Sequence, residues 1–351
     1  MNRAGQDAPR AGRNEPRVER VALLLCAVAV AGLTLVRAAV SALALGGLAA
    51  ILMQALGLVL FALVPSVLGL LVLSGDQTDV VRFKTLGTAQ ITLYAATGVL
   101  AVFPAALLGG VSQNLLQSFV TAVSSAIRAL TAPHALEAMR LPAAVFAGCA
   151  SDTAARLAGL VPGMASAVAA GGAAAELSAS LFLPMLLCHA LLAPVGEELF
   201  FRGYLLGSFE GRAGRRKAAL AVALLFALAH GLGGMTPVYL LLGLLFALLT
   251  LRADSVLAPM LAHACYNAAL VALQFLGAGA LLDVGTLPGC AVLLLGSAAF
   301  VGVLHRALAL RPGVKRARVW DGHGLSRREL TLLAGTGVAL LASLIVGGLL
   351  G

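Results

Sequence analysis

Long apolar runs, separated by short polar or basic stretches, make up most of the sequence after residue 20. A helix needs about 20 residues to cross the hydrocarbon core of a bilayer, so runs of this length predict membrane spans. The first run is long enough for a helical hairpin, and in all the pattern predicts an all-α, polytopic bundle of about nine spans. The apolar runs lie at about 21–73, 88–110, 177–209, 218–234, 236–251, 256–278, 287–310 and 331–350.

The composition supports a membrane protein. Apolar residues make up 60% of the chain and charged residues only 11%, whereas about a quarter of a soluble domain is charged. The net charge of +9 comes from basic residues in short loops and tails, where membrane topology accounts for them, and we therefore expect no nucleic-acid partner. The five cysteines lack C-x-x-C spacing and predict neither a disulfide framework nor a cysteine metal site.

Charge and apolar length divide the chain into five regions. Apolar pieces after residue 110 are too short to assign as spans, and amphipathic interfacial helices or paired re-entrant pieces both fit them. The expected regions are a disordered basic cytoplasmic tail at 1–20, a membrane region of about three spans plus these shorter helices at 21–176, a membrane core at 177–310, a basic cytoplasmic loop at 311–330 and a final span at 331–351.

The loop charges predict an orientation. Basic loops at 211–217, Arg252 and 306–328 alternate with charge-poor turns at 233–236 and 279–286. The positive-inside rule places the basic loops, and the N-terminus with them, in the cytoplasm. Because Arg far outnumbers Lys and Ala and Gly are abundant, as in GC-rich bacterial genomes, we expect a multi-pass protein of the bacterial inner (plasma) membrane.

Three polar patterns interrupt the apolar core. They are Glu197-Glu198-x-x-x-Arg202, Phe226-x-x-x-His230 and His263-x-x-x-Asn267. A charge at the centre of a bilayer costs at least about 2.5 kcal/mol on insertion scales, which makes such residues functional candidates. At about 1.5 Å per helical residue, all three patterns lie roughly 16–22 Å from the basic ends of their helices. The similar depth predicts that three helices contribute to one site.

Helical spacing separates the roles of the two glutamates. Glu198 and Arg202 share a helix face and can pair, whereas Glu197 points about 100° away. Two glutamates beside one arginine leave excess negative charge, which favours proton uptake by the acid that does not share the arginine's helix face. Glu197 is therefore the candidate general base, with Glu198 and Arg202 in support. His230 would hold the water that Glu197 activates.

The third pattern suits a different task. His263 and Asn267 lie one helical turn apart and direct an imidazole and an amide to one point, as a developing oxyanion requires. Pro194 frees a backbone carbonyl and kinks its helix, as happens where a membrane cavity is lined. Aromatic residues near the patterns are candidates for an apolar cleft that takes an extended or lipidated peptide: Phe200, Phe201, Tyr204, Phe226 and Tyr266.

Zinc offers an alternative use of the same residues. Glu197, His230 and His263 are suitable zinc ligands, and three protein ligands leave one position for a water. The sequence has no H-E-x-x-H segment, which is the local helical spacing typical of zinc proteases. We therefore favour a metal-independent glutamate mechanism without a cofactor.

In chain order, the polar segments resemble the three motifs of the CPBP (Abi) intramembrane protease family, which includes type II CAAX prenyl endopeptidases and bacteriocin-processing or immunity proteins. The matching segments are Gly196–Gly203, Phe226–His230, and Ser255–Pro259 followed by His263–Asn267. The resemblance covers about residues 177–280 and implies an all-helical membrane fold with a polar intramembrane cavity. It further implies that Glu197 is the base and that His230 shares the water. His263 and Asn267 would stabilise the oxyanion.

The resemblance favours an intramembrane endopeptidase that cleaves a membrane-associated protein or peptide precursor. A non-proteolytic immunity or scaffold protein would keep the same residues as a binding pocket. A transporter would also bury charges on broken helices, but it would show inverted repeats, and the sequence contains no second copy of the E-E-x-x-x-R segment.

Overall fold

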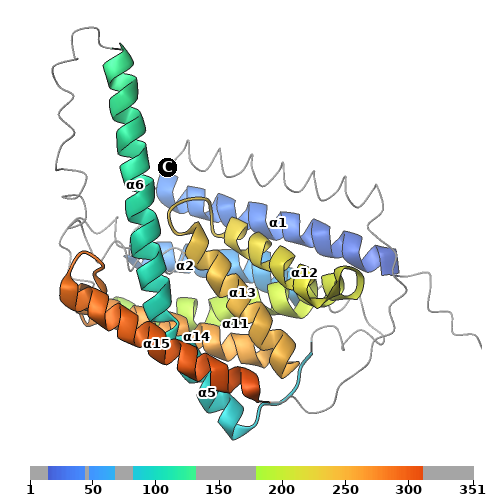
Figure 1. Ribbon diagram of the computed structural model, residues 1–351. Coiled ribbons are helices and arrows are strands. Elements are labelled where there is room, and N and C mark those ends of the chain that lie inside the picture. The colour runs from blue at the N-terminus through green and yellow to red at the C-terminus, as the bar shows by residue number, and fades with distance from the viewer. Residues whose placement is uncertain (1–14, 44–46, 68–81, 132–178, 311–351) are drawn as a thin grey trace, which may run out of the picture.

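The computed structural model describes residues 15–43, 47–67, 82–131 and 179–310, and every regular element in these ranges is a helix (Figure 1). The elements are α1 (Glu15–Ala42), α2 (Gly47–Leu58), η1 (Val59–Leu63), α5 (Thr88–Leu100), α6 (Val102–Thr131), η4 (Ala179–Leu181), α10 (Phe182–Met185), η5 (Leu186–Leu192), α11 (Ala193–Glu198), η6 (Leu199–Leu205), α12 (Leu206–Ala229), α13 (Thr236–Ala253), α14 (Leu257–Phe275), η7 (Ala278–Leu282) and α15 (Leu287–Ala309).

Five helical stretches in the described ranges are long and apolar enough to cross a bilayer. They are Gly47–Val67, Thr88–Ile127, Phe182–Glu210, Thr236–Ala253 and Leu287–Ala309. The all-helical, multi-pass architecture expected from the sequence is confirmed, and the total of nine spans stays a prediction. Of the stretch at 111–176 that was expected to form short helices, residues 111–131 belong to the single long helix α6. Helix α1 begins at Glu15, within the tail at 1–20 that was expected to be disordered. Residues 132–176, the basic loop at 311–330 and the final span at 331–351 lie outside the described residues.

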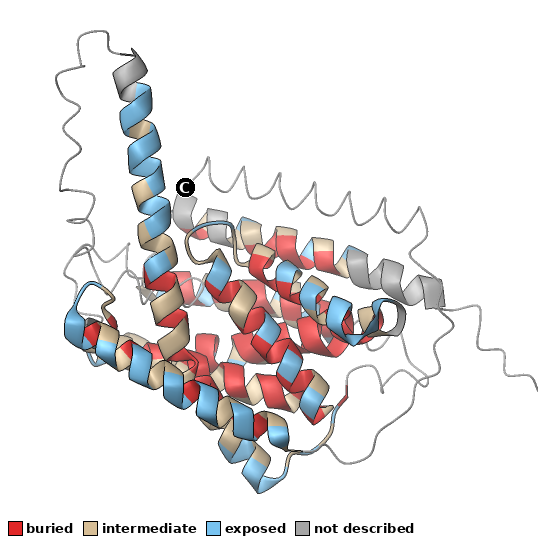
Figure 2. Ribbon diagram, in the orientation of Figure 1, coloured by how far each residue is buried: buried red, intermediate tan, exposed pale blue. Residues whose placement is uncertain are grey.

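The outer and inner surfaces of the bundle differ as a bilayer requires. Buried residues concentrate on the central helices, where α11, α13 and α14 lie, and exposed residues follow the outer sides of α6 and α15 (Figure 2). Leu287, Leu294 and Leu295 on α15 and Leu115 and Phe119 on α6 are all exposed. Large apolar side chains on the outside of a helical bundle are suited to contact lipid.

One helical rod forms the centre of the fold. From Phe182 to Glu210 the chain passes without interruption through α10, η5, α11 and η6 into α12. The segments η5 and η6 on either side of α11 are π-helical. Pro194 on α11 cannot donate a backbone hydrogen bond, and its ring disturbs the preceding turn. Single turns of π-helix absorb such a disturbance and are frequent at functional sites.

Two glycines allow the core helices to approach closely. A Cβ atom at Gly98 of α5 would collide with the backbone of Ala262 on α14. A Cβ atom at Gly243 of α13 would lie 2.9 Å from the Cα atom of Ala223 on α12. These glycines bring α5 close to α14 and α13 close to α12.

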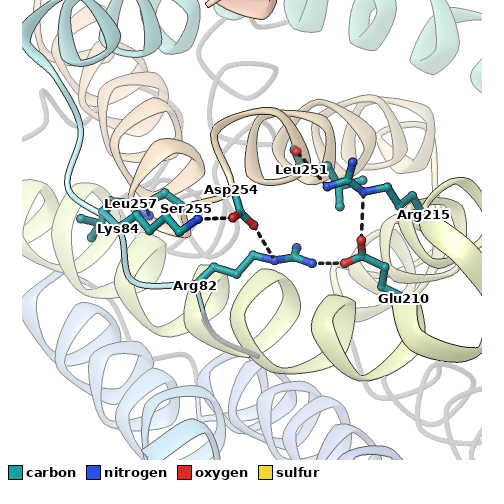
Figure 3. Close-up of polar contacts among 8 residues, drawn as sticks. All are labelled: Arg82, Lys84, Glu210, Arg215, Leu251, Asp254, Ser255 and Leu257. Carbon is teal, nitrogen blue, oxygen red and sulfur yellow. Dashed lines mark hydrogen bonds and ion pairs between the residues drawn. The ribbon is translucent and has the colours of Figure 1, made fainter. Parts of the chain in front are cut away.

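Ion pairs join three chain segments, which are the stretch before α5, α12 and the turn between α13 and α14 (Figure 3). Arg82, just before α5, pairs with Glu210 of α12 and with Asp254 in the turn between α13 and α14, where its Nε atom lies 3.1 Å from Oδ1. Lys84 also pairs with Asp254, and Arg215 Nε lies 2.9 Å from Glu210 Oε1. Arg82 and Asp254 both have φ above 50°, a strained conformation for residues other than glycine. The cluster therefore ties the segment before α5 to α12 and to the turn before α14.

Candidate active site

The polar residues predicted from the sequence meet inside the bundle. Glu197 and Glu198 lie on α11, Arg202 on η6, His230 just after α12, and His263 and Asn267 on α14. The side chains of all six are buried. The helices bring Glu197 to His230 and Glu198 to His263, whereas Asn267 contacts the backbone of His189.

Glu197 faces His230. The Oε2 atom of Glu197 lies 3.6 Å from the Nε2 atom of His230. The other ring nitrogen, Nδ1, lies 2.7 Å from the carbonyl oxygen of Phe226, and because a carbonyl only accepts, Nδ1 must carry a hydrogen. In the neutral ring, Nε2 is then the unprotonated nitrogen, and it points towards the carboxylate of Glu197.

Glu198 is held from two sides. Its Oε1 atom lies 2.9 Å from Arg202 Nη1 and 2.8 Å from His263 Nδ1. The contact with Arg202 is the one that the four-residue spacing predicts. The contact with His263 joins α11 to α14 and fixes the imidazole with its Nδ1 hydrogen on the carboxylate.

Arg202 lies in a cage of aromatic rings. No part of its side chain is exposed, and its Nη2 atom donates to the carbonyl oxygen of Gly243 at 3.1 Å. The Cζ atom is 4.4 Å from the ring centroid of Phe226, 5.3 Å from that of Phe246 and 5.8 Å from that of Phe201. Desolvated contacts of this kind stabilise a buried cation by about 2 kcal/mol or more.

The five aromatic residues proposed for a substrate cleft are all buried: Phe200, Phe201, Tyr204, Phe226 and Tyr266. Two of them, Phe201 and Phe226, contact the guanidinium of Arg202. The structure thus gives these two a packing role beside the ion pair, and their use as a substrate cleft stays a prediction.

Asn267 is held by a backbone oxygen. Its Nδ2 atom donates to the carbonyl oxygen of His189 at 2.6 Å, across 78 residues of sequence. His189 belongs to η5, one helical turn before Pro194. The amide therefore has a fixed orientation between α14 and η5.

Helix α13 contributes residues that the sequence analysis did not single out. The ring of Tyr239 lies 4.5 Å from that of His230 at an angle of 31°, and Phe246 stacks on His263 at 4.7 Å and 22°. Gly243 accepts from Arg202. The three residues are spaced by four and three positions, which places them on one helix face. The sequence does contain a signal for this face, which is two aromatic residues and a glycine at helical spacing within a leucine-rich span.

Zinc was the alternative for this site. Within the part of the chain that the structure describes, no three His, Cys, Asp or Glu side chains are grouped so that they could hold a metal ion. His263 uses Nδ1 for Glu198, and the proposed ligands Glu197, His230 and His263 do not form a three-ligand set.

The comparison with known families agrees with the site. The profile of the Rce1-like type II CAAX prenyl endopeptidase family matches residues 179–269, a stretch that contains all six polar residues and excludes the hairpin of α1 and α2 as well as α15. No curated protein and no solved structure matches the chain. The family is one of intramembrane peptidases, which act on protein substrates. The chain is therefore a multi-pass membrane protein that carries, in residues 179–269, a domain of the Rce1-like type II CAAX prenyl endopeptidase family.

Proposed function

We propose that the protein is an intramembrane endopeptidase that hydrolyses a peptide bond of a membrane-associated protein or peptide precursor with a water activated by Glu197. One observation carries the proposal. Glu197 Oε2 faces His230 Nε2 at 3.6 Å, while the neighbouring Glu198 is held by Arg202 and His263. One carboxylate thus has a structural partner on each side, and the other faces a histidine nitrogen suited to share a water.

The first step is attack by water. A water beside Glu197 and His230 donates one hydrogen to the carboxylate and the other to Nε2 of the neutral imidazole. A lone pair on its oxygen is then directed towards the substrate carbonyl carbon. As the new C–O bond forms, Glu197 takes the proton, and the former carbonyl oxygen becomes an oxyanion.

Asn267 and His263 stabilise that oxyanion. One Nδ2 hydrogen of Asn267 is used by His189, and the second remains to bind the developing charge. His263 donates from Nε2 when the ring is protonated, and its charge is then paired with the Glu198 carboxylate at Nδ1. The proton on Glu197 finally passes to the leaving nitrogen as the C–N bond breaks, giving an amine and a carboxylic acid with no change in oxidation state.

Glu198 and Arg202 support this chemistry without touching the substrate. Removing a charge from a buried ion pair leaves its partner uncompensated, so the pair fixes both members where they lie. Through Oε1, Glu198 also sets the plane of the His263 ring. The aromatic rings around Arg202 exclude water from the pair, which strengthens its electrostatic interaction.

New protein termini in the membrane fraction test the proposal. Cells that express the wild-type protein, the Glu197→Gln variant or neither are compared by mass spectrometry of enriched N-termini. The proposal expects termini that occur only with the wild-type protein. Equal sets of termini in all three samples, with both proteins present in the membrane, would instead favour an immunity or scaffold protein that does not cleave.

We further propose that the N-terminus and the ion-pair cluster of Figure 3 face the cytoplasm. The basic residues at 211–217 and Arg252, which the positive-inside rule places inside, lie close in the sequence to Glu210 and Asp254 of this cluster. In a protein without its native cysteines, a cysteine at the exposed Arg215 should react with an impermeant thiol reagent only after the cells are permeabilised. A cysteine at the exposed Gly233, in the charge-poor turn, should react in intact cells. The reverse pattern would invert the orientation.

A further inference from the structure

The backbone around Pro194 leaves one buried carbonyl without its helical donor. In η5 the hydrogen bonds span five residues, and the N–H of Ala193 donates to the carbonyl oxygen of Cys188. The next donor in this register would be residue 194, and its acceptor would be the carbonyl oxygen of His189. Residue 194 is a proline, which has no N–H.

Asn267 supplies the missing donor. Its Nδ2 atom lies 2.6 Å from the His189 carbonyl oxygen, and both residues are only 2% exposed. A buried carbonyl without a partner costs about 1–3 kcal/mol, so the contact satisfies an oxygen that the helix itself cannot. Only the nitrogen of the amide can face a carbonyl, and this settles which way the amide points.

We propose that Pro194 is a positioning residue: by withholding a backbone donor from His189, it turns that carbonyl into the anchor that orients the Asn267 amide. With one Nδ2 hydrogen on this anchor, the plane of the amide is fixed, and its second hydrogen points in a defined direction. The inference rests on the proposed function only for the use of that second hydrogen at an oxyanion. The hydrogen bond and its dependence on Pro194 stand apart from any activity.

Restoring the donor tests this dependence. In Pro194→Ala the chain regains an N–H that competes for the His189 oxygen, and the helix is free to return to regular α geometry. Both effects weaken the bond from Asn267. Pro184→Ala is the matched control, because Pro184 lies in the first turn of the same rod, where a helix has no use for its N–H.

Solid-state NMR of the protein in lipid bilayers measures the bond directly. Carbonyl carbons of histidine are labelled with ¹³C and asparagine nitrogens with ¹⁵N. No asparagine in the chain directly follows a histidine, so a short ¹³C–¹⁵N coupling reports a contact through space. The asparagines are Asn2, Asn14, Asn114 and Asn267, and loss of the signal in Asn267→Ser assigns it.

The expected result is a dipolar coupling between the Asn267 side chain and the His189 carbonyl in the wild-type protein and in Pro184→Ala. In Pro194→Ala the coupling should fall at least severalfold, and the amide hydrogen should exchange with solvent at least about tenfold faster, a factor that corresponds to about 1.4 kcal/mol. Unchanged coupling in a folded Pro194→Ala protein would overturn the inference.

If Pro194→Ala fails to fold, the spectrum of the wild-type protein still tests the inference. Absence of the coupling there removes the anchor and refutes the inference, whatever the protein cleaves. A coupling that depends on Pro194, found in a protein that produces no new termini, would keep the inference and reject the peptidase proposal.

Discussion

His263 Nδ1 lies 2.8 Å from Glu198 Oε1, although 65 residues separate the two in the sequence. This bond links the two helices that bear the glutamates and the candidate oxyanion donors. Since the same oxygen also binds Arg202, one buried carboxylate orients both a cation and an imidazole. The division of labour follows from this contact: Glu198 holds the site together, and Glu197 is left to face His230.

The Glu198→Gln substitution should therefore destabilise the protein strongly. The neutral amide leaves the fully buried Arg202 without its counter-charge, and breaking a buried pair in this way costs about 3–5 kcal/mol. Unfolding in detergent micelles measures the loss. Glu197→Gln is the matched control. It should change the free energy of unfolding far less, because the 3.6 Å between Glu197 Oε2 and His230 Nε2 is longer than a hydrogen bond. Equal stability of the two variants would contradict the assigned roles.

A second prediction concerns the close contact of α12 and α13. In Gly243→Ala the new Cβ atom meets Ala223 Cα at 2.9 Å and forces apart the helices that bring the Gly243 carbonyl to Arg202. Overpacking of this kind costs about 1–3 kcal/mol. Gly302→Ala on α15 is the control, since nothing lies within 4 Å of its Cβ position, and there alanine should be neutral or slightly stabilising. Equal free energies of unfolding for the two variants would show that the close approach at Gly243 does not contribute to stability.

Much of the helical framework was predictable from local signals. The runs expected at 236–251 and 287–310 correspond to α13 and α15, because proline near each start and a polar residue or loop at each end mark the limits of the apolar segment. Helix α12 begins earlier than its apolar run at 218–234. A bend at Gly214, where φ is 76°, lets the basic stretch continue in helical form, and periodicity does not reveal such a bend.

The candidate site was predictable only where partners are close in sequence. Glu198 and Arg202 are four residues apart, and their pairing follows from helix geometry. The contacts of Glu198 with His263 and of Asn267 with His189 depend on how distant helices pack. A carbonyl oxygen freed by Pro194 was expected from the sequence. Its hydrogen-bond donor, Asn267, was not, because no local pattern connects η5 to α14.

The role of His263 separates the glutamate mechanism from a zinc mechanism. Loss of an oxyanion donor in His263→Ala should lower kcat by about 10²–10³ and leave measurable turnover. Loss of a zinc ligand would release the metal and leave almost none. Turnover of a cleaved substrate by the purified proteins, combined with elemental analysis, measures the difference. Because His263 also binds Glu198, a reduced stability is expected and is corrected for by comparing folded fractions.

A strong chelator applied to the wild-type protein completes this comparison. The glutamate mechanism expects full activity after the treatment and well under one zinc per chain. Stoichiometric zinc, together with activity that is lost on chelation and restored by added zinc, would assign Glu197, His230 and His263 as ligands. The peptidase assignment would be unaffected.

Turnover of the purified Glu197→Gln protein in lipid bilayers is the most direct test of the account. A positioned general base contributes about 10²–10⁴ to the rate, and the amide keeps the shape of the side chain while it cannot take a proton. The account predicts a loss of kcat in this range, with the protein folded and its free energy of unfolding close to that of the wild type. Wild-type turnover in Glu197→Gln would show that another group activates the water and would contradict the central claim.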